Sequence, residues 1–272
     1  MQAAPESDIR QNQNLSFWDH LDVLRALLLR GAIVVAVFAV ALFAAMPSIF
    51  NEIILAPCRP DFATYRWLES IAGSNLLGLG GSDANIFSGN VNLVNINLAS
   101  QLMIHLSTSF WIALVAAVPV LLWLLWRFIA PALYDHERRP VSLSLMFGTL
   151  LFYVGAAVCY MMIFPLTLRF LASYQLSPLI PNVISLDSYM DTLTGMMLAM
   201  GLMFELPVLA WLLGRFHILN RDFFKRYRRH AICILLILAA IITPTGDPFT
   251  LALVFLPLYL LWELSSFTVP AG

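Results

Sequence analysis

Charged residues are scarce in this chain of 272 residues, at 11% of the sequence, whereas an average soluble domain has about 25%. Hydrophobic residues make up 60% of the sequence, and the mean hydropathy is +0.82. Several apolar runs approach the roughly 20 residues that a helix needs to cross a bilayer. A large soluble core would not need such runs, so the composition predicts an integral membrane protein.

Cysteines and enzyme motifs are scarce as well. The three cysteines, Cys58, Cys159 and Cys233, form no CxxC pair, which argues against a disulfide framework or a metal site. No GxSxG or P-loop occurs, and His136–Pro140 lacks the second histidine of HExxH. The apolar runs contain no Ser/His or paired-Asp site of an intramembrane protease. We therefore expect no enzyme activity, no cofactor and no nucleic-acid partner.

Six apolar stretches predict an all-α, polytopic membrane protein with one six-span domain over residues 1–272. The predicted spans are Arg25–Phe50, Gln101–Arg127, Val141–Phe164, Ser188–Leu213, His230–Thr243 and Pro248–Phe267. The first run is too long for the hydrophobic region of a signal peptide, so we expect it to be retained. The fifth run, about 14 residues or ~21 Å long, predicts local thinning of the bilayer or packing among partners.

Lysine and arginine are distributed unevenly between the two sides of these spans. One side holds Arg10, Arg25, Arg30, Arg127, Arg138, Arg139, Arg215, Arg221, Lys225, Arg226, Arg228 and Arg229. The other side holds Arg59, Arg66 and Arg169. By the positive-inside rule, this distribution predicts that both termini lie in the cytoplasm. The long segment 51–100 is then external, and we expect it to form a loop that caps the outer face.

A tight cluster of charge lies in the predicted cytoplasmic segment Phe128–Pro140. Its carboxylate, Glu137, follows His136 and precedes Arg138 and Arg139. These charges could simply solvate a short connection between two spans. Alternatively, Glu137 could hold a guanidinium group bidentately, in a geometry that lysine cannot reproduce. The spacing alone leaves both interpretations open.

Glu205 lies in the middle of the fourth span, two residues before Pro207. An ionisable residue at membrane depth costs roughly 2.5–3.5 kcal/mol, so a function is the default hypothesis. Glu205 is expected to line a polar cavity, contact a partner helix or bind a proton; a protonated side chain that only stabilises packing is the alternative. Pro207 frees the carbonyl of Met203 and predicts a bend there.

Five other polar residues give weaker signals. Ser16 and Asp19 fit a capping box for a helix that begins before the first span. Asp247 fits an external turn. Glu263 is expected to extend toward the cytoplasmic interface, and His105 is expected to be structural.

Several stretches together resemble the TatC family, the core membrane subunit of the twin-arginine protein translocase. They are His20–Arg25, Ala56-Pro57, Phe128–Tyr134 with His136–Arg139, Leu151–Gly155, Phe164-Pro165, Phe204–Pro207, Thr243-Pro244 and Asp247-Pro248. They cover nearly all six predicted helices, and Phe128–Arg139 and Phe204–Pro207 are quite specific. The resemblance implies a six-helix, glove-shaped bundle in the bacterial inner membrane, with both termini in the cytoplasm.

The resemblance also implies a receptor that binds twin-arginine signal peptides of folded precursors and recruits single-span TatA- and TatB-type subunits. Transport would be driven by the proton-motive force, and we expect a homo-oligomer. Glu137 matches the signal-binding glutamate of the family, and Glu205 matches its intramembrane glutamate near partner helices. The other expected signal-binding residues are Asp22, Arg25, Phe128, Arg138 and Arg139. Pro207 is expected beside the partner contact, and Pro57 and Asp247 are further motif positions.

One position departs from the family pattern. Val23 stands where the family has a glutamate that helps to bind the arginine pair. Asp22 is adjacent, but it lies about 100° around the helix and is one methylene shorter. Either Asp22 compensates, or Glu137 carries most of the recognition, or recognition of the arginine pair is relaxed.

A proton-coupled small-solute transporter that uses Glu205 is the competing interpretation. The sequence offers it a single central carboxylate and no internal repeat, which weakens the case for an inverted-repeat transporter. The function that we expect is therefore a receptor and scaffold for protein export.

Overall fold

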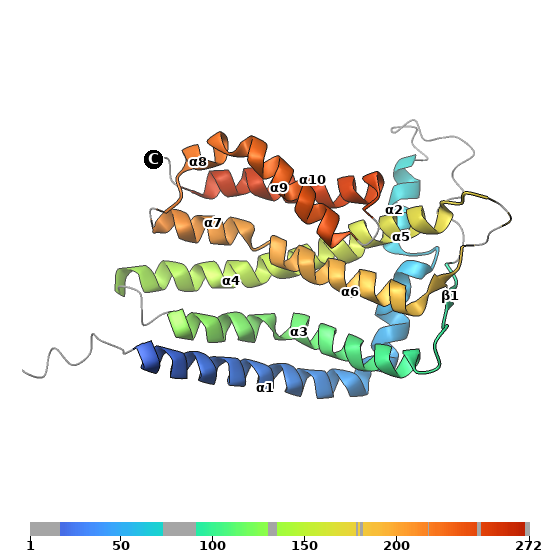
Figure 1. Cartoon of the computed structure of the whole chain (residues 1–272), viewed down its shortest axis with the longest axis horizontal. Coiled ribbons are helices and arrows are strands. Elements are labelled where there is room, and N and C mark those ends of the chain that lie inside the picture. Colours follow the sequence, from blue (N-terminus) through green and yellow to red (C-terminus); the bar gives the residue numbers. More distant parts are fainter. Residues whose placement is uncertain are drawn as a thin grey trace, which may run out of the picture.

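The computed structural model of the chain describes residues 17–72, 91–129, 135–177, 179, 182–216, 218–243 and 246–269, and at 17–20, 69, 71–72, 129 and 135–143 it describes the backbone alone. Most helices run side by side along the long axis, and α2 stands across one end (Figure 1). Two short strands, β1 (Leu93–Val94) and β2 (Ile184–Ser185), pair in parallel at that end, which we call the strand end. The fold is all-α apart from these strands, as predicted.

The long helices lie close to the predicted ranges. They are α1 (Phe17–Ile49), α3 (Ser100–Ile129), α4 (Asp135–Val158), α6 (Leu186–Met203), α7 (Leu206–Arg215), α9 (Arg228–Ile242) and α10 (Pro248–Thr268). Shorter helices are α2 (Ala63–Ala72), α5 (Phe164–Ser173) and α8 (Arg221–Arg226). The fourth predicted span is interrupted between α6 and α7, as its glutamate and proline indicate.

Within the described residues, five helical segments are long and apolar enough to cross a membrane. They are Leu21–Leu68, Ser100–Phe128, Ser144–Ser173, Leu186–Arg215 and Pro248–Thr268. Helix α9 has 15 residues, or about 22 Å of helix, which is shorter than a hydrocarbon core of roughly 30 Å. A sixth crossing at α9 therefore stays a prediction.

The end predicted for the third helix, at Phe164, is wrong. The helix passes through a π turn at Cys159–Ile163 and continues as α5 to Ser173. Pro165 lies in the first turn of α5. The Met161 carbonyl, four residues before this proline, accepts from the Thr64 hydroxyl, so the helix continues past Pro165 although the proline lacks an N–H.

The segment 51–100, predicted to be a loop, is partly regular. The first helix continues through a π turn at Phe50–Ile54 and a 3-10 turn at Ala56–Cys58, and α2 follows. At the far side of the segment, Leu93 of β1 pairs with Ile184 of β2. This pairing joins the segment to the start of α6. The described part of residues 51–100 is therefore not the simple loop that the sequence predicts, but includes helical turns, α2 and a strand.

Three prolines in these helices each release one backbone carbonyl, and a side chain from another helix binds it. Proline lacks the N–H that would bond to the carbonyl four residues earlier, and lipid offers no replacement donor. The sets of proline, released carbonyl and donor are Pro47, Phe43 and His105; Pro119, Val115 and Tyr153; and Pro165, Met161 and Thr64. Neighbouring helices therefore complete the hydrogen bonding that the prolines interrupt.

His105 shows this most fully. Its Nε2 lies 3.0 Å from the Phe43 carbonyl oxygen, and its ring stacks on the Phe43 ring at a centroid distance of 4.0 Å. The hydrogen bond joins α3 to α1 at the kink-prone position before Pro47. The structural role expected for His105 thus has a physical cause.

Three tyrosines bind carbonyl groups where the first helix turns toward α2. The irregular turns there leave carbonyls outside the regular helical pattern. The hydroxyl groups donate as follows: Tyr160 to Ile53 at 2.6 Å, Tyr189 to Ile54 at 2.5 Å, and Tyr65 to Pro57 at 2.8 Å. The donors come from the π turn at 159–163, from α6 and from α2, so this bend is fixed by three other parts of the chain.

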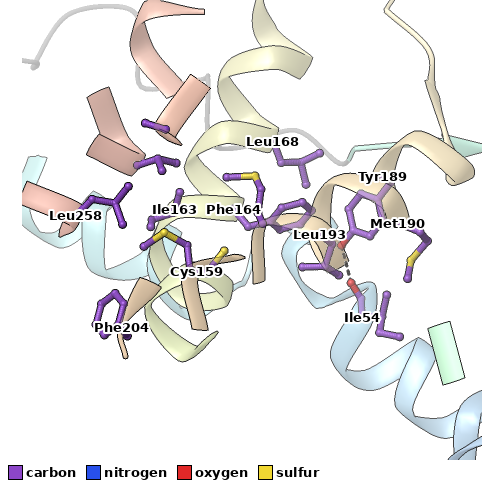
Figure 2. Close-up of a cluster of buried hydrophobic side chains, with 14 of the residues drawn as sticks. Ile54, Cys159, Ile163, Phe164, Leu168, Tyr189, Met190, Leu193, Phe204 and Leu258 are labelled. Carbon is purple, nitrogen blue, oxygen red and sulfur yellow. Dashed lines mark hydrogen bonds between the residues drawn. The ribbon is translucent and has the colours of Figure 1, made fainter. Parts of the chain in front are cut away.

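The main buried cluster lies beside the same bend (Figure 2). Phe164 and Tyr189 meet edge to face, with ring centroids 5.2 Å apart. Cys58 and Cys159 are buried free thiols, and Cys233 is an exposed one. Aromatic packing and hydroxyl-to-carbonyl bonds together hold this region.

Replacing Tyr189 with Phe should destabilise the protein, because the buried Ile54 carbonyl would lose its donor while the ring packing is kept. The expected loss is about 1–3 kcal/mol, measured as a shift of the unfolding midpoint in detergent. Tyr174→Phe is the matched control, because Tyr174 is 65% exposed. Equal midpoints for the two variants would contradict the structural role of the Tyr189 hydroxyl.

Candidate functional site

The predicted signal-binding residues lie at the end of the bundle where α1 begins, opposite the strand end (Figure 1). At this end α3 finishes and α4 begins. Asp22 and Arg25 are exposed on the first turns of α1. Neither makes a hydrogen bond or ion pair with a side chain that the structure describes. Val23, between them, is 48% exposed, so this turn of α1 is not covered by the described part of the chain.

The charged cluster belongs to the start of α4. Glu137, Arg138 and Arg139 lie in its first two turns, counted from Asp135. Their side chains are outside the described part of the chain, so their contacts stay a prediction. Phe128 is half-buried in the last turn of α3. The first turn of a helix favours a carboxylate, because its free N–H groups carry partial positive charge.

Glu205 occupies the break between α6 and α7. The Phe204 N–H still bonds to Met200 at 3.0 Å, whereas the Glu205 N–H bonds to Leu202, only three residues back, at 3.1 Å. The Glu205 side chain is half-buried, and its Oε1 makes no hydrogen bond with any described group. Oε1 is therefore an enclosed carboxylate oxygen with no donor among the described groups.

Gly148 of α4 faces the same carboxylate. A Cβ atom at position 148 would lie 2.6 Å from Oε2 of Glu205. The absence of a side chain at Gly148 therefore leaves the space that the carboxylate fills. Any larger residue there would push Glu205 away from α4.

Two further glycines bring α4 and α6 close together beside this carboxylate. A Cβ at Gly155 would lie 2.6 Å from the ring of Phe204, and one at Gly201 would lie 2.7 Å from the ring of Phe152. Each helix thus offers a glycine to an aromatic ring of the other. Small residues at helix crossings in membranes permit such approach, and here the crossing fixes the helix that carries Glu205.

The remaining motif positions have structural contacts. The buried Pro207 lies in the first turn of α7, and its carbonyl accepts from the Thr268 hydroxyl at 3.4 Å. Pro57 belongs to the bend after α1. Asp247 is the N-cap of α10 and accepts from the Thr250 N–H at 2.9 Å. Pro57 and Asp247 lie toward the strand end, so the structure does not bring them together with Asp22.

Two buried or paired charges were not anticipated. Ending the third helix at Phe164 puts Arg169 in an external loop, but it is 3% exposed, and its guanidinium carbon lies 4.5 Å from the centroid of the Tyr65 ring. Glu263 was expected only to extend toward the interface. It instead pairs with Arg228 at 2.8 Å and accepts from the Tyr259 hydroxyl at 2.8 Å. No local sequence pattern signals either pairing.

Comparison with known proteins gives consistent matches along the chain. The family model for the Sec-independent protein translocase protein TatC matches residues 19–257. The chain is 29% identical over 255 residues to the protein of that name from Blattabacterium sp. subsp. Periplaneta americana (strain BPLAN), covering 94% of this chain and 95% of the relative. It is 39% identical over 180 residues to that of Deinococcus radiodurans, covering 65% of each.

Two crystal structures described as the twin arginine translocase receptor TatC are similar to this fold. One has a TM-score of 0.70 at 29% identity and covers 92% of this chain and 97% of its own. The other, obtained in DDM, has a TM-score of 0.72 at 28% identity and covers 91% and 98%. The likeness therefore extends over almost the whole length of both chains.

Gly201→Ala should destabilise the protein, because the added methyl group would press on the Phe152 ring, which is 1% exposed and cannot move freely. Overpacking of this kind costs about 1–3 kcal/mol. Gly195→Ala on the same helix is the control: nothing lies within 4 Å of its added Cβ, so this change should be neutral or stabilising. Unfolding midpoints in detergent measure both, and a neutral Gly201→Ala would contradict the tight crossing.

Proposed function

Because the chain belongs to the TatC family of Sec-independent protein translocase proteins, we propose that it is the receptor that binds twin-arginine signal peptides of folded precursors. The family is a component of the bacterial translocase, so the chain is a multi-pass membrane protein of protein transport and not an enzyme. The proposal concerns which residues bind the signal peptide and which bind partner subunits.

The observation that carries the proposal is the exposed start of α1 at the same end of the bundle as the start of α4 (Figure 1). Asp22 supplies a carboxylate from α1, and Glu137 supplies one from α4. Most of the lysines and arginines of the sequence belong to segments at this end, so a cationic peptide would need carboxylates such as these two in order to bind there. We assign this end to the cytoplasm, where precursors arrive.

Charge-assisted hydrogen bonds explain why arginine would be selected. A carboxylate accepts two parallel N–H bonds from a guanidinium group, whereas a lysine ammonium group acts as a point charge. Glu137 is the principal acceptor in this proposal. Asp22 assists it in place of the glutamate that Val23 replaces, and Arg25, Phe128, Arg138 and Arg139 complete the surface.

Glu205 has a separate role in the proposal. Its Oε1 lacks a donor among the described groups, and a hydrogen bond across helices is a common way to satisfy a polar group in lipid. A single-span subunit of the TatA or TatB type would supply that donor. Pro207 lies in the first turn of α7, directly after this break. The Glu205 side chain is half-buried and its Oε1 is enclosed, so the side chain would turn toward the partner to form this bond.

The wider arrangement follows the same reasoning. α9 would be the fifth of six crossings in a single domain, with a thinned bilayer or partner helices around it. Both termini would lie in the cytoplasm of a bacterium, and copies of the chain would associate in a receptor complex. The proton-motive force would drive transport through the assembled complex.

Glu137→Ala should abolish precursor binding without unfolding the bundle, because it removes the bidentate acceptor. A photo-crosslinking probe beside Glu137, in native membranes, would report contact with a precursor that carries Arg-Arg or Lys-Lys in its signal. We expect crosslinks to Arg-Arg only. Glu52→Ala, at the strand end, is the control and should leave the crosslinks unchanged.

Two outcomes would count against the proposal. Equal crosslinks to Arg-Arg and Lys-Lys would mean that the hydrophobic part of the signal provides the binding. Unchanged crosslinks after Glu137→Ala would remove this residue from the site. Val23→Glu adds a third measurement: it should strengthen binding of the Arg-Arg precursor, since it restores the acceptor that Asp22 replaces.

Glu205→Leu should reduce co-purification of TatA- and TatB-type subunits while precursor crosslinking persists, because the hydrogen-bond acceptor is lost at a place remote from Glu137. Glu205→Gln keeps an acceptor and should retain more of the partner. Met203→Leu, a neighbouring apolar change, is the control. Equal recovery of partner subunits with all three variants would overturn this role.

A further inference from the structure

A groove runs between α1, α3 and α6 toward the strand end, with a volume of about 810 Å³. Most of its lining is apolar and includes Val40 and Phe43 of α1 and Phe110 of α3. Two carboxylates, Asp187 and Asp191, line it from the first two turns of α6. The groove therefore combines an apolar wall with negative charge.

The two carboxylates differ in their surroundings. Asp187 is half-buried and accepts a hydrogen bond from the Ser100 hydroxyl at the start of α3. Asp191 lies one turn further along α6, is exposed, and makes no hydrogen bond or ion pair with any group that the structure describes. Helix α6 belongs to a segment apolar enough to cross a membrane, and charged side chains on such segments usually pair with another group or face a polar cavity.

The groove itself supplies no positive charge to Asp191. The residues that line it include no lysine or arginine. His105 lies on the adjacent part of α3, but its Nε2 is held by the Phe43 carbonyl and its ring by the Phe43 ring. No described residue around the groove therefore supplies a counter-charge to Asp191.

We propose that this groove binds a membrane-spanning helix of another protein that carries a lysine or arginine at the depth of Asp191. The wall offers exposed apolar surface, with Val40 74% and Leu106 58% exposed. The stem of a lysine or arginine packs along such a surface while its charged group reaches a carboxylate. One helix would then cover the apolar wall of the groove and supply a cation to Asp191.

A phospholipid satisfies only one of these features. Its acyl chain covers the apolar wall, but its phosphate group is repelled by two carboxylates of the same sign, and the ammonium group of a zwitterionic headgroup is already balanced by that phosphate. Asp187 and Asp191 are four residues apart, about 6 Å along the helix axis and on one face. A single cation on a helix can thus lie between them.

This surface is distinct from the residues of the proposed receptor function. Asp191 lies at the opposite end of α6 from Glu205 and on different helices from Asp22 and Glu137. The inference adds a partner contact and does not rest on signal-peptide binding. Variants of Asp191 should leave the crosslinks from the probe beside Glu137 unchanged, so failure of one proposal is distinguishable from failure of the other.

The test uses the full chain in phosphatidylcholine vesicles and a fluorescent synthetic helix of leucine and alanine. One peptide carries a single lysine placed at the depth of Asp191, and a second carries glutamine at the same position. Energy transfer from a dye attached near the groove reports binding. The lysine peptide should bind the native chain at least roughly tenfold more tightly than the glutamine peptide.

The variants then assign the contact to Asp191. Asp191→Asn should remove the preference for lysine, and Asp191→Lys should transfer the preference to a peptide with glutamate at that position. Asp222→Asn, an exposed change on α8 at the opposite end, is the control and should have no effect. Equal binding of the lysine and glutamine peptides, or a lysine preference that survives Asp191→Asn, would overturn the proposal. So would occupation of the groove by lipid alone.

Discussion

The need to bind every backbone carbonyl within the protein governs this structure. Lipid cannot donate a hydrogen bond, so a carbonyl released by proline is costly unless another group binds it. His105, Tyr153 and Thr64 supply such donors to three helices. The bend after α1 obeys the same constraint through three tyrosines. These bonds run between helices, so they position the helices as well as satisfying the backbone.

Three glycines leave space for side chains of the neighbouring helix where α4 meets α6 and Glu205. Gly155 and Gly201 bring α4 and α6 so close that an aromatic ring of each helix rests on the backbone of the other. Gly148 then leaves room for the Glu205 carboxylate on the same face of α4. The position of Glu205 is therefore a product of helix packing, because moving α4 outward would open the space around the carboxylate and remove its support.

Local patterns in the sequence predict the helices well and their contacts poorly. Apolar runs place α3, α9 and α10 to within about two residues, and Glu205 with Pro207 marks the break after α6. The continuation past Phe164 is not predictable locally, because the donor for the Met161 carbonyl is Thr64, 97 residues earlier. The exposure of Asp22 is consistent with its place before the first apolar run. The burial of Arg169 could not be predicted, because the predicted helix ended at Phe164 and left Arg169 outside it, whereas α5 continues to Ser173.

Hydrogen bonds between distant residues also impose an order of events during synthesis. The Ile54 carbonyl accepts from the hydroxyl of Tyr189, which is 135 residues further along the chain and is therefore synthesised much later. Until α6 has been made, the bend after α1 lacks this donor. The hydrogen bonds of the bend after α1 are thus complete only after more than half of the chain has been made.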